Sequence, residues 1–547
     1  MADALGYLSD GRSVSQPVSR LVGLGLGPML RGCSSALLRE RPSCLWLAWL
    51  AGTAVASLPL LATSFPPLGQ HFFNLVRMQI LAHPALYARD FIVRWDAIPD
   101  LGMDLTVPSL STVMPVEQAS RLFLFTSLAL LTSGAALLSR VVNRRWSVLP
   151  LVSFLLLYNW ILVRGYENNL SGLGLCLWAL AAHIALRHAP IARVLVSTCS
   201  ALVLYFFHLF ALGVFALVIG ALEVGCLFTE GHFWRRSMVH TAAALLPLVP
   251  PCILLWRSST GQLVGGIEFA PLMLWTKIKL CIEVLTVGDR LSDALLLASL
   301  AAATVVALAR RWLRCEPECR LLVVLMPLIA VFAPFYAFSS FGVVERSAIA
   351  FAFLLTALLG LRVVDTRLQR AVAGALALVF LIRIGTITSD WRAADQMIAV
   401  YQTAFATLER GSVLLQFDQD VGYPSPLGNP HRWNPPLDKV VTLATLDGIL
   451  VPLLYLRVGQ QPVLYRTEDA SLRAFQRDSG ARPQRFADDA VLHAWLTQLR
   501  ERFPDLQKRF RAVYVAIYDP ERLLSPSIPD AQLVATLPEH RLYRLSS

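Results

Sequence analysis

Long apolar segments recur along the first 385 residues of this chain, and short polar segments separate them. A helix that crosses a bilayer needs roughly 20 mostly apolar residues, so each segment predicts a span, and the shorter ones need help from their flanks or a thinner membrane. The separate segments are residues 44–65, 122–142, 148–163, 169–186, 241–256, 293–309, 321–338, 348–361 and 371–385. The pattern predicts a polytopic α-helical membrane protein.

The run 194–228 is too long for one span and barely long enough for two. The positive-inside rule asks that the arginine clusters between spans share one side of the membrane. These clusters are Arg140/Arg144/Arg145, Arg187/Arg193, Arg235/Arg236, Arg310/Arg311/Arg314/Arg320 and Arg362/Arg367/Arg370. They share a side only if 194–228 crosses twice, with a turn between His208 and Gly213. This gives about 11 spans.

The N-terminal residues 1–43 carry several arginines and no signal-peptide core, so we expect this segment to be cytoplasmic and the first span to be an uncleaved anchor. The C-terminus then lies outside, at a bacterial inner membrane. Composition agrees with a membrane protein: 56% of residues are hydrophobic and 16% charged. The net charge of +11 could indicate nucleic-acid binding, but its arginines cluster between the spans, and we expect no nucleic-acid partner.

Two regions between the predicted spans carry candidate functional residues. The first external loop, 66–121, is long and polar, and long loops are usually functional or disordered. The segment 257–292 holds Lys277 and Lys279, and it predicts an interfacial helix whose lysines face lipid phosphate or act as snorkelling anchors.

After residue 385 the composition changes. Residues 386–547 mix helical and strand-like runs, which predicts a soluble extracytoplasmic α+β domain. The strand-like runs are SVLLQF, KVVTLATL, AVYVAIY, QLVATL and HRLYRL, and the helical run is DDAVLHAWLTQLRERF.

The first loop supplies the main candidates for acid–base chemistry. Asp100 and Asp104 are four residues apart, so on one helix both carboxylates would share a face. Two neighbouring carboxylates can hold a divalent metal ion, or one can serve as a base. Alternatively, Asp100 caps a short helix and Asp104 is solvated. His71, near the membrane surface, is a further candidate base or a structural histidine.

Other polar residues lie in the short connections that the topology places outside. Glu167 lies in the very short loop RGYENN, and His208 lies at the predicted turn within YFFHLFALG. Glu345 and Arg346 lie between two spans, where they could pair with each other, or Arg346 could hold a phosphate. The topology allows these residues to converge on one face. No nucleotide-binding motif is present, which argues against an ATP-driven pump.

Several stretches together resemble a known family. They are VRMQIL, PDLGMDLTVPSL, EQASRLFLF, NNLSGLGLCLWALA, FFHLFALG and GILVPLLYLRVGQQPVLY. With the long first external loop and the C-terminal external domain, they resemble the GT-C superfamily of membrane glycosyltransferases, and more narrowly a group of bacterial polytopic proteins with that architecture.

The resemblance implies inverting transfer of a sugar from a polyprenyl-phosphate donor to a cell-envelope glycan or lipid acceptor on the outer face. It implies Asp104, Asp100 or Asp96 as the acid–base residue, and Arg164, Lys277, Lys279 and Arg346 as phosphate ligands. In the family an acid follows the first span, whereas here the sequence is Gly69-Gln70-His71 and the next acid is Asp90. The alternative is a non-catalytic relative: a transporter or a scaffold for envelope polysaccharide assembly.

Overall fold

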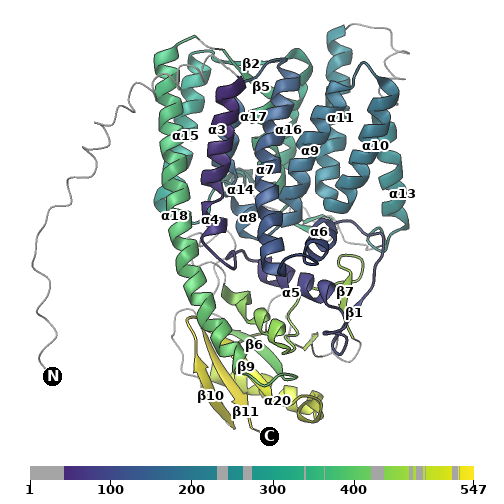
Figure 1. Ribbon diagram of the computed structural model, residues 1–547, viewed down its shortest axis with the longest axis vertical. Helices are drawn as coiled ribbons and strands as arrows, with labels where there is room; N and C mark the ends of the chain where they lie inside the picture. Colours follow the sequence, from purple (N-terminus) through teal and green to yellow (C-terminus); the bar gives the residue numbers. More distant parts are fainter. Residues whose placement is uncertain are drawn as a thin grey trace, which may run out of the picture.

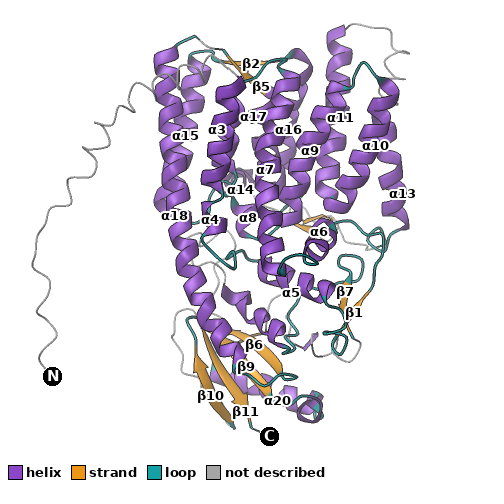
Figure 2. Cartoon of the chain, viewed as in Figure 1, coloured by secondary structure: helices purple, strands orange, loops and turns teal. Residues whose placement is uncertain are grey.

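The computed structural model describes residues 42–230, 244–262, 274–334, 336–337, 340–362, 364–419, 437–466, 472, 474–475, 484–486, 488–519, 528 and 530–546. In Figures 1 and 2 a bundle of helices stands on a smaller domain of strands and helices. The long helix α18 (Thr366–Ala406) runs from the bundle into that domain.

Every segment that the sequence predicts as a span contains helix in its described residues. The bundle elements are α3 (Pro42–Ala56), α4 (Leu58–Leu61), α7 (Val116–Val142), η1 (Leu149–Leu156), α8 (Trp160–Val163), α9 (Glu167–Ala185), α10 (Pro190–Phe207), α11 (Leu209–Glu230), η2 (Leu246–Leu248), α13 (Val249–Arg257), α14 (Leu274–Glu283), α15 (Arg290–Ala309), η3 (Pro317–Cys319), α16 (Arg320–Phe332), α17 (Val343–Leu358) and α18. Within the described chain, 5 of these helices are long and apolar enough to cross a membrane. The chain is therefore a multi-pass membrane protein.

The predicted break in the run 194–228 is confirmed. Helix α10 ends at Phe207, His208 has extended backbone (φ −167°, ψ 123°), and α11 begins at Leu209. The two helices form an antiparallel hairpin, because Arg193 near the start of α10 pairs with Glu223 near the end of α11. By contrast, the predicted span 321–338 ends early: α16 stops at Phe332, with Pro334 two residues beyond.

Arginines of separate connections meet at the end of the bundle opposite the C-terminal domain. There β2 (Leu313–Cys315) pairs antiparallel with β5 (Leu359–Leu361). Arg145 Nη2 donates to Leu361 O at 2.5 Å, and Arg314 Nη2 donates to Asn143 O at 3.3 Å. The predicted grouping of arginine clusters at one end thus appears for these connections.

The first loop and the C-terminal region share one hydrophobic core, which is separate from the core of the bundle. Phe72 and Val107 of the loop belong to the same cluster as Phe417 and Leu443. The loop contributes α5 (His71–Ala82), β1 (Phe91–Val93) and α6 (Gly102–Leu110), and β1 pairs antiparallel with β7 (Val463–Tyr465). The loop is therefore an ordered layer between the bundle and the terminal sheet, as Figure 1 shows.

The C-terminal region is built on a five-stranded sheet in the order β10-β11-β9-β6-β8. Strand β6 runs parallel to β8 and β9, and the remaining pairs are antiparallel. The remaining bounds are β3 (Tyr336–Ala337), β4 (Ser340–Phe341), β6 (Val413–Gln419), η4 (Leu437–Asp447), β8 (Gln484–Phe486), α20 (Asp489–Arg502), α21 (Leu506–Arg509), β9 (Val513–Tyr518), β10 (Ala531–Thr536) and β11 (His540–Leu545).

Two expectations about this region are wrong. The run KVVTLATL is the 3₁₀ helix η4, not a strand, because consecutive residues such as Val440 and Val441 are both buried, between α5 and α18. The change of composition after residue 385 does not end a helix: α18 continues unbroken for 41 residues. It continues because Trp391 and Tyr401 are buried beyond that point.

A buried ion pair ties three parts of the bundle together. Arg383 Nη1 of α18 lies 2.5 Å from Asp293 Oδ1 of α15, and Arg383 Nη2 donates to Tyr158 O and Leu285 O. Asp293 also accepts from the backbone N–H groups of Val287 and Gly288, at 2.7 to 3.1 Å. This pair satisfies backbone groups that would otherwise be buried without partners.

Replacement of Asp293 by Ala leaves Arg383 buried without its counter-charge. We expect the free energy of unfolding to fall by about 3–5 kcal/mol, measured by denaturant unfolding of the protein in detergent. The matched control is Arg392→Ala, an exposed arginine on the same helix, for which we expect a change within about 0.5 kcal/mol. Equal effects of the two substitutions would contradict the assigned role of the pair.

Candidate functional site

Four chain breaks meet at the end of the bundle that faces the C-terminal domain. They are the segment before α6, the turn between α8 and α9, the α10–α11 break at His208, and the start of α17. Contacts between these breaks bring Asp100, His208, Tyr166 and Arg346 together. Of the residues that the topology allowed to converge, His208 and Arg346 are therefore brought together.

Asp100 lies in a strained turn just before α6. Its φ of +66° is unusual for a residue other than glycine. Asn168 holds the turn: its Nδ2 donates to Asp100 O at 2.6 Å, and its Oδ1 accepts from Met103 N at 2.8 Å. Asp100 Oδ1 accepts from Leu209 N at 3.0 Å, so it caps the start of α11. The Asp100 side chain is still 42% exposed, so it stays accessible.

His208 lies between Asp100 and Arg346. Its Nδ1 is 3.8 Å from Asp100 Oδ1 and 3.1 Å from the donor Phe210 N, while its Nε2 is 3.4 Å from Arg346 Nη1. Burial lowers the pKa of His208 to about 4; Asp100 opposes this shift and Arg346 adds to it. The ring is therefore neutral at pH 7, and the Asp100–His208 contact is not an ion pair.

Arg346 is a buried cation on the first turn of α17. Its guanidinium lies 4.5 Å from the centre of the Tyr166 ring, an arrangement that holds the planar group in a fixed orientation. Glu345 precedes it, and neighbouring helix positions do not face each other. No ion pair between the two is present in the described structure, and Glu345 Oε2, which is buried, has no hydrogen-bond partner there.

The turn between α8 and α9 carries two further predicted residues. Arg164 stacks on Trp160, with its guanidinium carbon 5.0 Å from the ring centre. Glu167 is buried and bonds to His71 Nδ1 and, at 2.9 Å, to Asn74 Nδ2. Position 165 requires glycine, because its φ is +74° and because a Cβ would lie 2.6 Å from Gln70 N. The turn is thus fastened to the segment that contains His71.

Asp104 is not brought together with Asp100. The two would share a face only on one helix, but Asp100 precedes α6 and has left-handed backbone. Asp104 is 1% exposed, and both its oxygens accept from Arg77, at 2.7 Å from Nε and 3.2 Å from Nη2. The predicted shared metal site therefore does not form. The described residues hold no group of at least 3 His, Cys, Asp or Glu that could bind a metal ion.

The remaining predicted residues have other partners. Asp96 lies 3.5 Å from Arg94, and both side chains are partly exposed. Lys277 Nζ donates to Ala333 O at 3.1 Å, where it caps the end of α16. Lys279 pairs with Glu283 at 3.3 Å, four residues along α14.

Sequence reasoning missed the residues that orient the candidates. Asn168 shapes the turn at Asp100, Asn74 bonds to Glu167, and Arg77 neutralises Asp104. A signal existed for Arg77, because a lone charge within the apolar run of VRMQIL predicts a buried partner. No signal existed for the two asparagines, since their partners lie far away in the chain.

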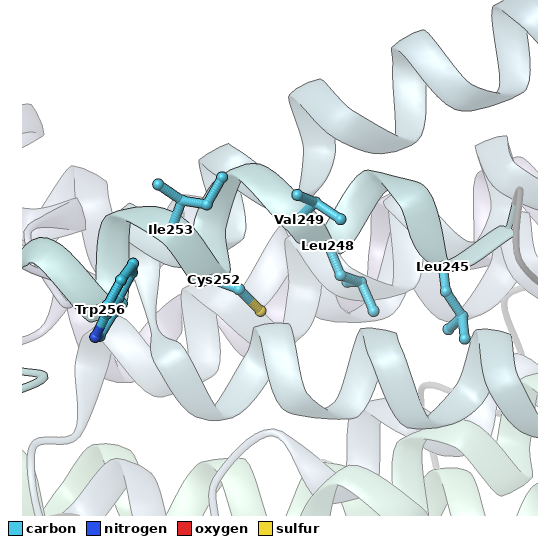
Figure 3. Close-up of a pocket in the computed structure, with 6 residues that line it drawn as sticks. All are labelled: Leu245, Leu248, Val249, Cys252, Ile253 and Trp256. Carbon is cyan, nitrogen blue, oxygen red and sulfur yellow. The ribbon is translucent and has the colours of Figure 1, made fainter.

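Two surface grooves lie apart from this cluster. One has a volume of about 430 Å³ and follows one side of α13, where its lining is almost wholly apolar. Figure 3 shows the residues that form it: Leu245, Leu248, Val249, Cys252, Ile253 and Trp256. The other, of about 550 Å³, lies between Leu58 and the face of α18 that carries Thr388 and Arg392. Neither groove contains Asp100, His208 or Arg346.

The sequence matches no protein-family model and no curated protein. The structure resembles ArnT from Cupriavidus metallidurans bound to undecaprenyl phosphate, with a TM-score of 0.50, 10% identity, and 92% of this chain and 98% of that chain covered. The apo structure of the same ArnT gives a TM-score of 0.43, 13% identity and the same coverage. ArnT is a GT-C glycosyltransferase. The similarity to the lipid-bound structure confirms the GT-C-like membrane fold that the sequence predicts.

Proposed function

We propose that this protein transfers a sugar from a polyprenyl-phosphate donor to a glycan or lipid acceptor of the bacterial cell envelope. The observation that carries the proposal is the arrangement of Asp100, His208 and Arg346, in which an accessible carboxylate and a fixed cation flank a neutral histidine. Backbone strain at a non-glycine residue such as Asp100 often marks a functional site. The shared fold with an ArnT that binds undecaprenyl phosphate supports a lipid-phosphate substrate.

The orientation follows from charge. Cytoplasmic connections of membrane proteins carry an excess of lysine and arginine, and Arg145 and Arg314 lie at the end opposite the C-terminal domain. We therefore assign that end to the cytoplasm of an inner-membrane protein. The cluster at Asp100 and the C-terminal domain then lie outside, where a lipid-linked sugar meets an envelope acceptor.

The residues divide the chemistry between them. Asp100 takes the proton of the acceptor hydroxyl as that oxygen attacks the anomeric carbon. The bond from this carbon to the phosphate oxygen breaks on the opposite face, so the configuration inverts. The electron pair leaves with the polyprenyl phosphate, whose charge Arg346 and Arg164 stabilise. His208 is neutral, so only one of its ring nitrogens accepts a hydrogen bond, and its ring lies between Asp100 and Arg346.

The other candidates take supporting roles. The carboxylate of Asp104 is engaged with Arg77, so it fixes α5 against α6. His71 and Glu167 join the exit of the first span to the start of α9. Among the carboxylates of the first loop, Asp100 is therefore the one we assign as the base.

Asp100→Asn keeps the side chain's shape and its capping oxygen but removes the base. We expect transfer to fall about 10²–10⁴-fold with little loss of stability, measured as transfer from undecaprenyl-phosphate sugars to envelope lipids in proteoliposomes. The matched comparison is Asp104→Asn, which leaves Arg77 without its counter-charge. We expect this substitution to lower the thermal midpoint of unfolding in detergent. Full transfer activity of Asp100→Asn would contradict the assignment of the base.

Arg346→Gln removes the cation that we assign to the lipid phosphate. A hydrogen bond to a charged group contributes about 1.5–3 kcal/mol, so we expect binding of undecaprenyl phosphate to weaken roughly 10- to 100-fold. Equilibrium binding to protein in lipid nanodiscs measures this change, with exposed Arg392→Gln as the control. Arg346→Lys should restore binding only in part, because an ammonium cannot reproduce the planar stacking on Tyr166. Unchanged binding in Arg346→Gln would exclude Arg346 as the phosphate ligand.

A further inference from the structure

Glu345 is a buried carboxylate that the mechanism above does not use. It lies in the first turn of α17 and is 7% exposed. Its Oε2 is buried and has no hydrogen-bond partner among the residues that the structure describes. The carboxylate curls back over the helix start, with Oε2 3.7 Å from the position that a Cβ on Gly342 would take.

A buried carboxylate in this position lowers the stability of the folded protein. A buried charged group without a full set of hydrogen bonds lowers stability, and buried polar atoms are nearly always paired. The free oxygen of Glu345 therefore indicates a donor that the protein itself does not supply.

The neighbours of Glu345 identify what that donor is attached to. Arg346, the next residue of α17, stacks on Tyr166, two residues after Arg164. The turn that carries Arg164 therefore lies against the helix start that carries Glu345, and both arginines are the cations assigned to the lipid phosphate. A phosphate held by these arginines would place the first sugar ring within reach of the same carboxylate. A carboxylate would repel the phosphate, but it is a strong acceptor for the hydroxyl groups of a sugar.

We propose that Glu345 binds the sugar of the donor by accepting a hydrogen bond from a ring hydroxyl group. This inference rests on the proposed function and extends it, because it separates recognition of the sugar from recognition of the lipid phosphate. Arg164 and Arg346 hold the phosphate, Glu345 holds the sugar, and Asp100 receives the proton from the acceptor.

The test compares two ligands in the wild-type protein and in Glu345→Gln. Binding to nanodisc-embedded protein is measured for undecaprenyl phosphate and for a panel of undecaprenyl-phosphate-linked hexoses and pentoses. In the wild type we expect at least one sugar-bearing lipid to bind more tightly than the bare lipid. In Glu345→Gln we expect this preference to shrink by roughly tenfold or more. Bare lipid should bind at least as tightly as before, because a negative charge beside the phosphate has been removed.

Glu283→Gln is the matched control, since Glu283 lies on α14, which packs against α17, but already pairs with Lys279. It should leave the preference for the sugar-bearing lipid unchanged. An equal loss of both ligands in Glu345→Gln would overturn the inference and indicate a structural role. A wild type that binds bare and sugar-bearing lipid equally would also overturn it, with lipid recognition intact. If neither the bare lipid nor any sugar-bearing lipid binds the wild type, the proposed function is refuted, and the inference with it.

Discussion

Backbone groups that a helix break exposes within an apolar bundle must find partners, and this constraint shapes the rest of the structure. Most polar side chains at the breaks serve it. Asn159 accepts from Ile161 N and Leu162 N at the start of α8, Asp293 accepts from the turn before α15, and Lys277 donates to the end of α16. Among the described residues at the breaks, three groups are not used in this way: the stacked guanidinium of Arg164, the exposed part of Asp100 and one oxygen of Glu345.

Asp100 shows how a single residue serves both purposes. One of its oxygens caps α11, so the carboxylate is fixed relative to the break at His208. Its backbone is held in a strained conformation by Asn168, from the neighbouring helix α9. The layer made by α5 and α6 in turn shares a hydrophobic core with the terminal sheet, and the unbroken helix α18 connects this region to the bundle. The C-terminal domain therefore supports the loop that carries Asp100.

The sequence predicted what local patterns control. Apolar segments became helices, the long run 194–228 broke at His208, and strand-like runs became β6, β9, β10 and β11. It failed where distant segments decide the outcome. The boundary at residue 385 fell inside α18, since a helix that leaves the membrane changes composition without ending. Asp100 and Asp104 were expected on one face, but a left-handed turn separates them, and only the contact with Asn168 explains that turn.

The missing acid after the first span has a spatial counterpart. His71 follows that span, and its ring bonds to the carboxylate of Glu167, which comes from α9. The sequence directly after the first span contains no acidic residue, but the fold places the carboxylate of Glu167 beside this segment. Both oxygens of Glu167 are engaged, one with His71 and the other with Asn74, and the side chain is buried. An acceptor hydroxyl would have to displace one of these partners to reach it, whereas Asp100 is accessible without any displacement. Access, more than position in the chain, is the reason to assign the base to Asp100.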